Sequence, residues 1–310
     1  MRILNYNIEY GGFEKNTNYM EYVNIILDNK IDCFVATEPF EPCIEQIHVN
    51  YNMFCENTIG KVVQELNKSN SSTNRYYFIT TKSKNASIIC RYPIKLEVDP
   101  TCMQEYCIIT LNPLYSIKLI CIHLVDYPYT FYSLRNIPYD NTPMKFKTKE
   151  EIVDLSYSTK AADIERVLKF VKNNLTDKIV ILGDFNEPSH LDDPSNEWKV
   201  SKKFEEVGLV DSYRSKNMVI IKDNLGYNID GATCCFDELL QKELLQKEPP
   251  SRIDYIYVLN IDVIESSVLN QYKKLSDHLP VLTEIDTYYS NYFYKYLKYK
   301  YKYTMMLLSK

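Results

Sequence analysis

The most constraining feature of the sequence is a short apolar run that ends in two polar residues. Lys178-Ile179-Val180-Ile181-Leu182 is followed by Gly183-Asp184-Phe185-Asn186. The β-branched residues predict a strand, and Gly183 is expected to mark its end. Because residues two apart on a strand point the same way, Asp184 and Asn186 are predicted to face one point in space. Taken alone, the motif is more simply interpreted as a turn with Asx hydrogen bonds.

Length and charge set broad limits on the protein. With 310 residues, the chain is long enough for one domain of about 250 residues plus an appendage, or for two domains. The formal net charge of −5 argues against a broad basic face for nucleic acid. It does not exclude a nuclease, because a local groove or a bound cation also handles phosphate.

The cysteines and the N-terminus indicate a cellular location. The nine cysteines show no Cys-x-x-Cys spacing, and buried free thiols are the expected interpretation. The first residues already resemble a strand, so we expect no signal peptide. No apolar run approaches the roughly 20 residues that span a bilayer. We therefore expect a cytoplasmic protein in a reducing compartment, neither secreted nor membrane-spanning.

Apolar and β-branched segments predict many strands and few helices. Strands are expected at Arg2–Ile8, Asp32–Thr37, Asn52–Cys55, Tyr76–Thr80, Ser87–Cys90, Cys107–Leu111, Ile117–His123, Lys178–Leu182, Met218–Ile221, Ile253–Leu259 and Val281–Ile285. Helices are expected at Met20–Leu27, Ala161–Val171, Lys199–Val207 and Asp237–Glu248. This pattern predicts an α/β sandwich in which helices cover two packed sheets.

Several of these segments end in acidic, amide or imidazole groups. The pieces are Asn7-Ile8-Glu9, Thr37-Glu38, Ile122-His123-Leu124, Gly183-Asp184-Phe185-Asn186, Arg252-Ile253-Asp254-Tyr255 and Ser276-Asp277-His278. In this order and spacing they resemble the endonuclease/exonuclease/phosphatase superfamily of metal-dependent phosphoesterases. The segments Ser87–Ile94 and Gly208–Arg214 agree with that resemblance. It covers nearly all of the chain up to about Ile285.

The resemblance implies a fold and a role for each matching residue. It implies a DNase I-like, four-layer α-β-β-α sandwich of two mixed sheets over residues 1–286. Glu38 would be the main metal ligand, with Asn7, Glu9 and Asp277 completing or supporting the metal shell. Asp184 would align or deprotonate the attacking water, and Asn186 would help hold water and phosphate. His278, backed by Asp254, would contact the phosphoryl oxygens, as would His123.

Electrostatics supports a metal ion at such a site. If Glu9, Glu38, Asp184, Asp254 and Asp277 converge, two charges about 4 Å apart repel by roughly 4 kcal/mol at an effective dielectric near 20. Raised pKa values, a cationic neighbour or a bound metal relieve this repulsion. Oxygen ligands without a Cys or His cluster favour a hard ion, so Mg²⁺ or Mn²⁺ is the expected cofactor.

Each piece also has a simpler structural explanation. His123 in an apolar strand is more often a satisfied core histidine, Ser276–His278 fits a helix cap or turn, and Arg252 with Asp254 fits a surface ion pair. The sequence also departs from the family pattern, since Thr37 replaces the Gln that usually precedes the metal-binding Glu, and Tyr6 precedes Asn7. Neither change removes a ligand, so both affect substrate preference more than catalysis.

The long segment Val125–Ser158 is expected to be a loop that contacts substrate. Tyr129 is a candidate for stacking a base or sugar, although tyrosines more commonly pack a loop onto the protein body. Arg135 and Lys145 are candidate phosphate contacts.

The C-terminal residues 287–310 form a tail with its own pattern. Tyr289, Tyr292, Tyr296, Tyr299 and Tyr303 follow helical spacing, with lysines between them. Docking on the domain or self-association is the preferred role, ahead of binding nucleic acid or a membrane. Such Tyr-Lys tails resemble proteins of giant amoeba-infecting viruses, which would place the protein in the host cytoplasm.

Three functions follow from the sequence. The first is metal-dependent hydrolysis of a phosphodiester or phosphomonoester of unassigned identity, small or lipid-linked. The second is a DNA or RNA endonuclease or exonuclease of the same superfamily. The third is a non-catalytic binding or assembly protein that uses the tail.

Overall fold

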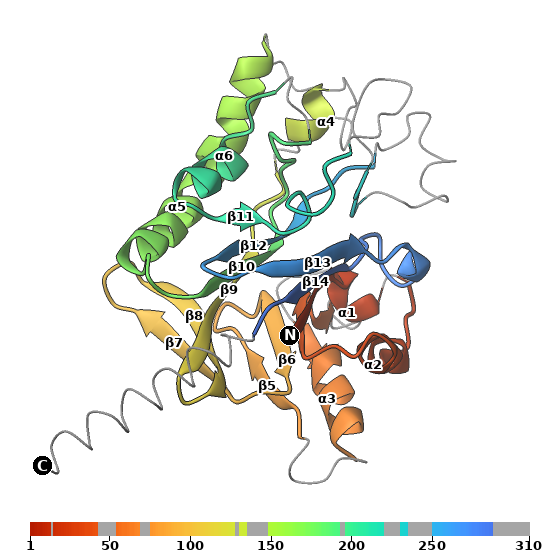
Figure 1. Cartoon of the computed structure of the whole chain (residues 1–310). Coiled ribbons are helices and arrows are strands. Elements are labelled where there is room, and N and C mark those ends of the chain that lie inside the picture. The colour runs from red at the N-terminus through yellow and green to blue at the C-terminus, as the bar shows by residue number, and fades with distance from the viewer. Residues whose placement is uncertain are drawn as a thin grey trace, which may run out of the picture.

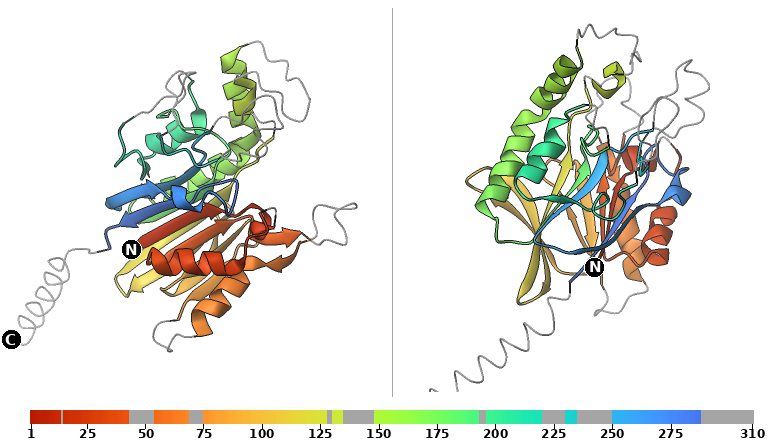
Figure 2. Two further views of the ribbon diagram at one scale, coloured as in Figure 1. Left: turned by 90° about the vertical axis from the view of Figure 1, so that its right-hand side faces the viewer. Right: turned by 45° about the horizontal axis from the view of Figure 1, so that its top comes forward.

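The structure is a computed structural model that describes residues 1–13, 15–42, 54–68, 75–127, 130–134, 148–192, 196–219, 230–234 and 250–287. Within these residues two six-stranded sheets pack face to face, and helices lie on the outer face of each sheet (Figures 1 and 2). The four-layer α/β/β/α sandwich expected from the sequence is therefore confirmed.

The first sheet contains the N-terminal strand at its centre. Its order is β13 (Val263–Val268), β14 (Val281–Ile285), β1 (Arg2–Asn7), β2 (Cys33–Thr37), β6 (Ala86–Cys90) and β5 (Tyr77–Thr80). Strands β1 and β2 are parallel, and the other neighbours are antiparallel. All residues of β2 are buried, because one face meets helices and the other meets the second sheet. A strand covered on both faces has this near-continuous apolar sequence.

The second sheet repeats this plan. Its order is β11 (Val210–Asp211), β12 (Asp254–Leu259), β10 (Ile179–Asp184), β9 (Tyr115–His123), β8 (Gln104–Asn112) and β7 (Ile94–Asp99). Here β9 and β10 form the parallel pair, flanked by antiparallel strands. A separate two-stranded sheet joins β3 (Phe40–Pro42) and β4 (Phe54–Asn57).

Three apolar cores hold the layers together. The helices are α1 (Glu9–Gly12), α2 (Tyr19–Asp28), α3 (Thr58–Lys68), α4 (Thr130–Leu134), α5 (Lys149–Asn173) and α6 (Lys199–Glu206). One core lies between the first sheet and α2 and α3, and another between the second sheet and α5 and α6. On β10, Val180 and Leu182 enter the core between the sheets, whereas Ile179 and Ile181 face α5. This alternation is the period of two that a strand imposes.

Most expected strands are present, with shifted ends. Strands occur at every expected segment except Met218–Ile221, whose described residues 218 and 219 lie outside any strand. The sequence did not predict β3, β7, β11 and β13, nor α1, α3 and α4. Strand β13 has the polar sequence Val-Ile-Glu-Ser-Ser-Val and lies at a sheet edge. Because that edge is exposed to solvent, the strand lacks the apolar pattern from which strands were predicted. The expected helix Asp237–Glu248 lies outside the described residues, as does the tail beyond residue 287.

Helix α5 corrects the expectation of a loop through Ser158. It begins at Lys149, twelve residues before the expected start at Ala161. A capping box starts it: Thr148 accepts a hydrogen bond from the Glu151 amide, and the Glu151 side chain accepts one from the Thr148 amide. The apolar period fails in this part because Ser156 and Lys160 are polar but buried.

Gly183 does not end its strand. It pairs within β10 with both neighbouring strands, and a Cβ there would lie 1.7 Å from the carbonyl oxygen of Ile122. Its φ of +139° also disfavours any other residue. The glycine therefore lets β9 approach β10 closely. A residue that only ended the strand would not need this close contact.

Among the cysteines that the structure describes, Cys234 differs from expectation. Cys33, Cys90, Cys102, Cys107 and Cys121 are free thiols, whereas Cys234 is disulfide-bonded. The prediction of free thiols throughout is thus wrong at Cys234, because spacing along the chain carries no information about which cysteines meet in the fold.

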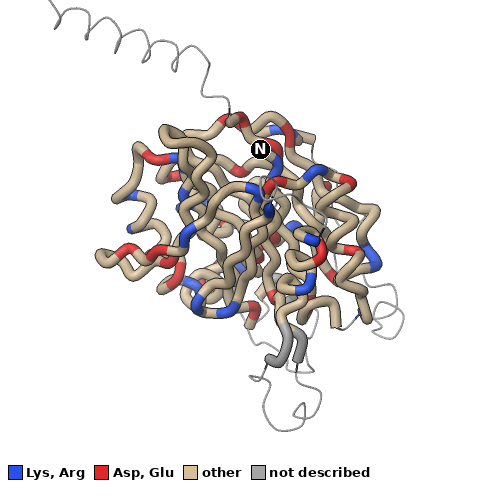
Figure 3. The backbone as a smooth tube through the Cα atoms, turned by 90° about the horizontal axis from the view of Figure 1, so that it is seen from below, with Lys and Arg blue, Asp and Glu red and all other residues tan. Residues whose placement is uncertain are grey.

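In the view of Figure 3, lysines and arginines are interspersed with aspartates and glutamates along the described backbone. None of the described helices has the length and hydropathy that a membrane crossing requires.

Candidate active site

The two parallel strand pairs deliver polar side chains where they end. Asn7, the last residue of β1, pairs in register with Thr37 at the end of β2, and Glu38 follows directly. In the second sheet, Asp184 at the end of β10 pairs with His123 at the end of β9. Parallel neighbours end on the same side of a sheet, so each pair places two functional groups side by side.

The antiparallel neighbours begin at the same edge. Asp254 opens β12 directly opposite Asp184. His278 comes shortly before β14, which runs antiparallel to β1. The side chain of Asn5 also joins the sheets here, because its Nδ2 donates to the Gly183 carbonyl at 3.0 Å. The two sheets are therefore held together next to this group of polar side chains from the strand ends, here called the carboxylate cluster.

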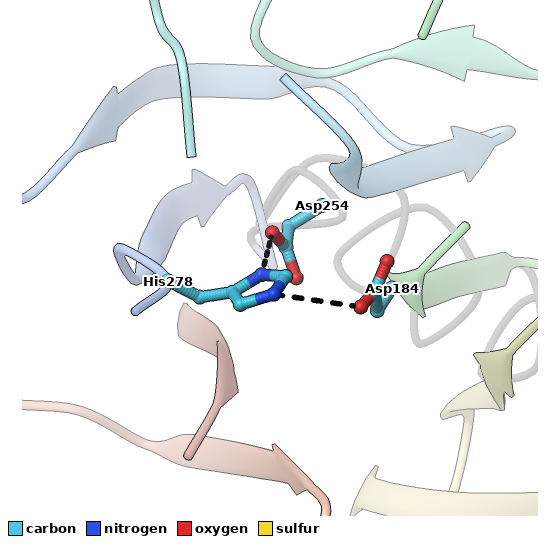
Figure 4. Close-up of side chains that lie close together, drawn as sticks. All are labelled: Asp184, Asp254 and His278. Carbon is cyan, nitrogen blue, oxygen red and sulfur yellow. Dashed lines mark hydrogen bonds and ion pairs between the residues drawn. The ribbon is translucent and has the colours of Figure 1, made fainter. Parts of the chain in front are cut away.

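His278 lies between two carboxylates (Figure 4). Its Nδ1 is 2.7 Å from Oδ2 of Asp254, and its Nε2 is 3.8 Å from Oδ2 of Asp184. All three side chains are buried, with exposures of 7%, 0% and 1% in that order. A buried imidazole held by a carboxylate on one nitrogen presents the other nitrogen in a fixed direction.

This environment shifts two ionisation equilibria. Burial raises the pKa of Asp184, and the nearby Asp254 carboxylate raises it further, although His278 and His123 oppose the shift. Burial alone would lower the pKa of His278, but Asp254, Asp277 and Asp184 outweigh it and raise that pKa well above 6.5. Opposite charges within about 4–6 Å favour the charged form of a group in this way. The neighbouring carboxylates therefore favour the protonated form of His278.

Asn7 forms hydrogen bonds to one carboxylate from each sheet. Its Nδ2 donates to Oε1 of Glu38 at 3.0 Å and to Oδ2 of Asp184 at 3.1 Å. Its Oδ1 accepts the backbone N–H of Glu9 at 3.1 Å. The amide nitrogen therefore faces the carboxylates, while the oxygen that could bind a metal is turned toward the Glu9 backbone.

The remaining expected residues extend the same network. His123 places Nε2 3.4 Å from Oε1 of Glu38. The backbone N–H of Asp277 donates to Oε2 of Glu9 at 3.3 Å. The Asn186 side chain donates to the Leu124 carbonyl at 2.9 Å. The structure thus brings together every expected catalytic and metal-binding residue: Asn7, Glu9, Glu38, His123, Asp184, Asn186, Asp254, Asp277 and His278.

Asn186 reaches the cluster by a turn and not by strand geometry. It follows β10 with a φ of +47°, and its backbone N–H donates to Oδ1 of Asp184 at 2.8 Å. The strand argument for its direction is therefore wrong, although the Asn186 backbone does contact the Asp184 side chain. The Asx turn that was the simpler interpretation is present and forms part of the cluster.

Four residues at the cluster have left-handed backbone conformations. Glu9, Tyr10, Glu38 and Asn186 have φ values of 44°, 50°, 52° and 47°. Residues other than glycine in this left-handed region cost about 1–3 kcal/mol each and persist where the surroundings enforce them. Such residues are typical of catalytic and ligand-binding sites.

The donor set fits a hard metal ion. Asp184, Asp254 and His278 each offer a ligand atom within 4.8 Å of the others. Oδ1 of Asp254 is buried and has no hydrogen-bond partner in the described part of the chain. On the opposite side of Asn7, Glu38 supplies a further carboxylate. Carboxylate oxygens with few nitrogen ligands suit Mg²⁺ or Mn²⁺ better than softer ions.

A buried polar group behind the cluster was missed by sequence reasoning. Glu187 accepts hydrogen bonds from the Ser156 hydroxyl at 2.5 Å and the Val200 amide at 3.1 Å. Lys160 donates to Ser156 at 3.3 Å, and burial lowers its pKa despite the charge of Glu187. These contacts fix the chain just after Asn186 to α5. Their only sequence signal was the polar break in the apolar period of that helix.

A buried ion-pair network supports the other side of the same segment. Asp192 is bound by Arg214 at 2.6 Å and by Arg252 at 2.8 Å. Arg252 also binds Asp211 at 2.7 Å. Arg252 is 3% exposed, so the interpretation of this arginine as part of a surface ion pair is wrong. These ion pairs fix Arg252, which lies two positions before Asp254.

Three expected substrate contacts cannot be placed. Tyr129, Arg135 and Lys145 all lie outside the described residues. His190, to which the sequence assigned no role, contacts Ser201 at 2.8 Å and Glu205 at 3.2 Å, and neither belongs to the cluster.

No protein-family model matches this sequence, and neither does any curated protein. Solved structures do resemble the fold. An endonuclease/exonuclease/phosphatase family protein from Leptotrichia buccalis matches with a TM-score of 0.53 and 18% identity, over 92% of this chain and 99% of the other. An AP endonuclease from Archaeoglobus fulgidus matches with a TM-score of 0.54 and 15% identity, over 93% and 100% of the two chains.

A third similar structure is the 3′ phosphatase NExo from Neisseria, solved with a product DNA hairpin. It matches with a TM-score of 0.51 and 17% identity, over 92% of this chain and 99% of that one. Likeness at these identities establishes the fold. The chain therefore has the DNase I-like fold of endonuclease/exonuclease/phosphatase proteins.

Proposed function

We propose that this protein is a metal-dependent phosphoric ester hydrolase. The observation that carries the proposal is the buried His278–Asp254 pair, whose free imidazole nitrogen faces the Asp184 carboxylate. A cationic donor and a carboxylate of raised pKa that lie 3.8 Å apart suit the attack of water on a phosphoryl group.

Each residue has a role that its contacts support. Asp184 has a raised pKa, so it accepts a proton from water more readily than an ordinary aspartate does. The Asn186 turn fixes its Oδ1. His278, as an imidazolium, donates to a phosphoryl oxygen and stabilises the negative charge that develops there. Asp254 holds the imidazolium ring in one orientation through Nδ1. General acid–base help of this kind contributes about 10²–10⁴-fold in rate.

We place the metal ion on the Glu38 side of the cluster. A protonated His278 does not ligate a cation, so the group formed by Asp184, Asp254 and His278 serves better as proton-transfer machinery than as a complete metal site. Glu38 would be the principal ligand, supported by Glu9 and Asp277. When bound, Mg²⁺ or Mn²⁺ supplies charge neutralisation at the phosphoryl oxygens.

Asn7 has a different role in this proposal from the one its sequence position implied. Its nitrogen bonds two carboxylates, so it holds Glu38 and Asp184 at a fixed separation. Such a spacer keeps the metal side and the proton-accepting side of the site aligned. Rigid positioning of reacting groups is itself a large contribution to catalysis.

The proposal is tested with purified protein, Mg²⁺ or Mn²⁺, and two chromogenic esters. Turnover of p-nitrophenyl phosphate or bis-p-nitrophenyl phosphate is expected, and Asp184→Asn and His278→Gln should each remove it while the protein stays folded. His190→Gln is the matched control, since this imidazole lies outside the cluster. Full activity in both cluster variants would show that the site is elsewhere.

A nuclease of the same fold is the second candidate. Two of the similar structures are named as an AP endonuclease and as a 3′ phosphatase bound to DNA, which favours DNA as a substrate. Incubation with plasmid DNA and with an abasic-site duplex tests this candidate. Cleavage that weakens as salt rises would support it. A wild-type protein that hydrolyses neither the chromogenic esters nor DNA would favour the non-catalytic alternative.

A further inference from the structure

A cavity of about 550 Å³ opens beside the carboxylate cluster. Its walls are the turn between β5 and β6 on one side and strands β7, β8 and β9 on the other. Small-molecule sites typically enclose about 300–1,000 Å³. The cavity is therefore large enough to hold a drug-sized organic group.

One end of the cavity belongs to the candidate active site. His123 lines it and lies 3.4 Å from the Glu38 carboxylate. Asn85 lines it too, and its carbonyl accepts the backbone N–H of Glu38 at 3.2 Å. A phosphoryl group bound at the cluster would thus direct one of its ester arms into this space.

Apolar side chains line part of the wall away from His123, among polar and charged ones. Leu96 and Val98 on β7 and Cys121 on β9 all line the cavity and are only partly buried. Met103 stands at the rim, where it is 68% exposed with a φ of +56°. An exposed methionine beside half-buried aliphatic side chains offers an adaptable apolar surface.

The charges of the lining cancel. Lys82 and Arg166 are its basic residues, and Glu105 and Asp163 its acidic residues. Arg166 is moreover ion-paired with Asp163. A polyanion would gain no net attraction here, whereas nucleic acid binding depends on an excess of basic groups. The occupant that this charge balance favours is uncharged.

We propose that the cavity binds the uncharged, apolar alcohol arm of a phosphate ester whose phosphoryl group lies at the carboxylate cluster. This inference rests on the proposed hydrolase function and specifies its substrate class. Hydrolysis of such a diester would break the bond between phosphorus and its other ester oxygen. Water supplies the new P–O bond and the proton of that departing group, while the arm in the cavity stays on the phosphoryl group.

The test uses alkyl p-nitrophenyl phosphate diesters with methyl, butyl and octyl arms. All three release the same p-nitrophenolate, so only the arm changes. In the wild type kcat/KM is expected to rise by roughly fourfold for each methylene that is buried. Val98→Trp and Leu96→Trp, which fill the cavity, should remove this dependence on length.

The matched control is Ile264→Trp on β13, the edge strand of the other sheet, where the side chain is 53% exposed. This control should keep the full dependence on arm length. The proposal is overturned if the cavity variants, folded by circular dichroism, keep the wild-type ratio of octyl to methyl ester. It is also overturned if they lower the rates of both esters equally.

A binding measurement separates this inference from the proposed hydrolysis. Octyl phosphonate is expected to bind the wild type by calorimetry at least 10-fold more tightly than Val98→Trp, whether or not any ester is turned over. Equal binding by both proteins would overturn the inference even for an active enzyme. If a single-stranded oligonucleotide binds the wild type but not Val98→Trp, the cavity is assigned to nucleic acid instead.

Discussion

The Nδ1 atom of His278 lies 2.7 Å from the Oδ2 atom of Asp254, and both side chains are buried. His278 belongs to the segment before β14 in the first sheet, and Asp254 opens β12 in the second. The pair therefore spans the interface between the two sheets. Its geometry depends on how the sheets pack and is the basis of the proposed chemistry.

Replacing Asp254 by Asn is expected to lower kcat by about 10²–10⁴-fold, because a neutral amide no longer stabilises the imidazolium. In the wild type the raised pKa favours the protonated form of His278, so activity falls only as the pH rises well above 6.5. In Asp254→Asn this alkaline limb should move to lower pH. The measurement is kcat/KM from about pH 5 to about pH 10.

The same variant tests the pair through stability. A histidine pKa that is raised on folding adds stability that is fully present below the unfolded pKa of about 6.5 and is lost as the pH rises through the folded pKa. The Tm of wild type minus that of Asp254→Asn should thus shrink toward alkaline pH. Asp154→Asn on the exposed face of α5 is the control. A Tm difference that does not change with pH would contradict the ion pair between His278 and Asp254.

Removal of metal is expected to abolish hydrolysis, and added Mg²⁺ or Mn²⁺ to restore it. Glu38→Gln should raise the Mg²⁺ concentration for half-maximal activity by roughly 10- to 100-fold, because an amide oxygen carries no charge. Titration of Mg²⁺ by calorimetry and by activity checks both statements. Glu105→Gln, in the cavity, is the matched substitution that should leave metal affinity unchanged. Activity that survives a chelator would refute the metal requirement.

Gly183→Ala is expected to destabilise the protein severely. The new Cβ would meet the Ile122 carbonyl at 1.7 Å, so β9 and β10 would have to separate next to Asp184. Destabilisation of more than about 4 kcal/mol, or failure to fold, is the expected result. Urea unfolding monitored by circular dichroism measures it.

Gly60→Ala is the matched control for that substitution. Gly60 lies within α3, and a Cβ there meets nothing within 4 Å. Alanine should therefore stabilise the protein by about 0.5–1 kcal/mol. Similar effects of the two substitutions would disprove the close approach at Gly183.

Asp192→Ala is expected to cost about 3–5 kcal/mol, because it leaves the buried guanidinium groups of Arg214 and Arg252 short of a partner. The unfolding midpoint in urea checks this value. Glu197→Gln, which removes an exposed partner of Lys202, should change stability by less than about 0.5 kcal/mol. A small effect at Asp192 would mean that water or Asp211 replaces the lost carboxylate.

Sequence patterns predicted the sheets well because their signals are local. In β10 the continuous apolar run Ile179–Leu182 reports a strand that is buried on both faces. The same logic failed at the start of α5. There Ser156 and Lys160 are buried by a hydrogen-bonded contact with Glu187, which no local period reveals.

The types of residue at the candidate site were also predictable, while their contacts were not. The motifs named Asp184, His278 and Glu38 as functional. They did not reveal that Asn7 turns its nitrogen toward two carboxylates, or that Arg252 is buried in an ion-pair network. Both arrangements depend on partners more than 30 residues away along the chain.

The sequence by itself determined the layered α/β class, the position of most strands and the set of polar residues at strand ends. These features follow from periodicity and residue chemistry, which act over a few neighbouring positions. Only the tertiary structure decided that His278 meets Asp254, that Gly183 serves a close strand contact, and that a cavity adjoins His123. Distance and burial depend on the packing of two sheets, the first of which combines strands from both ends of the chain. No local pattern encodes that packing.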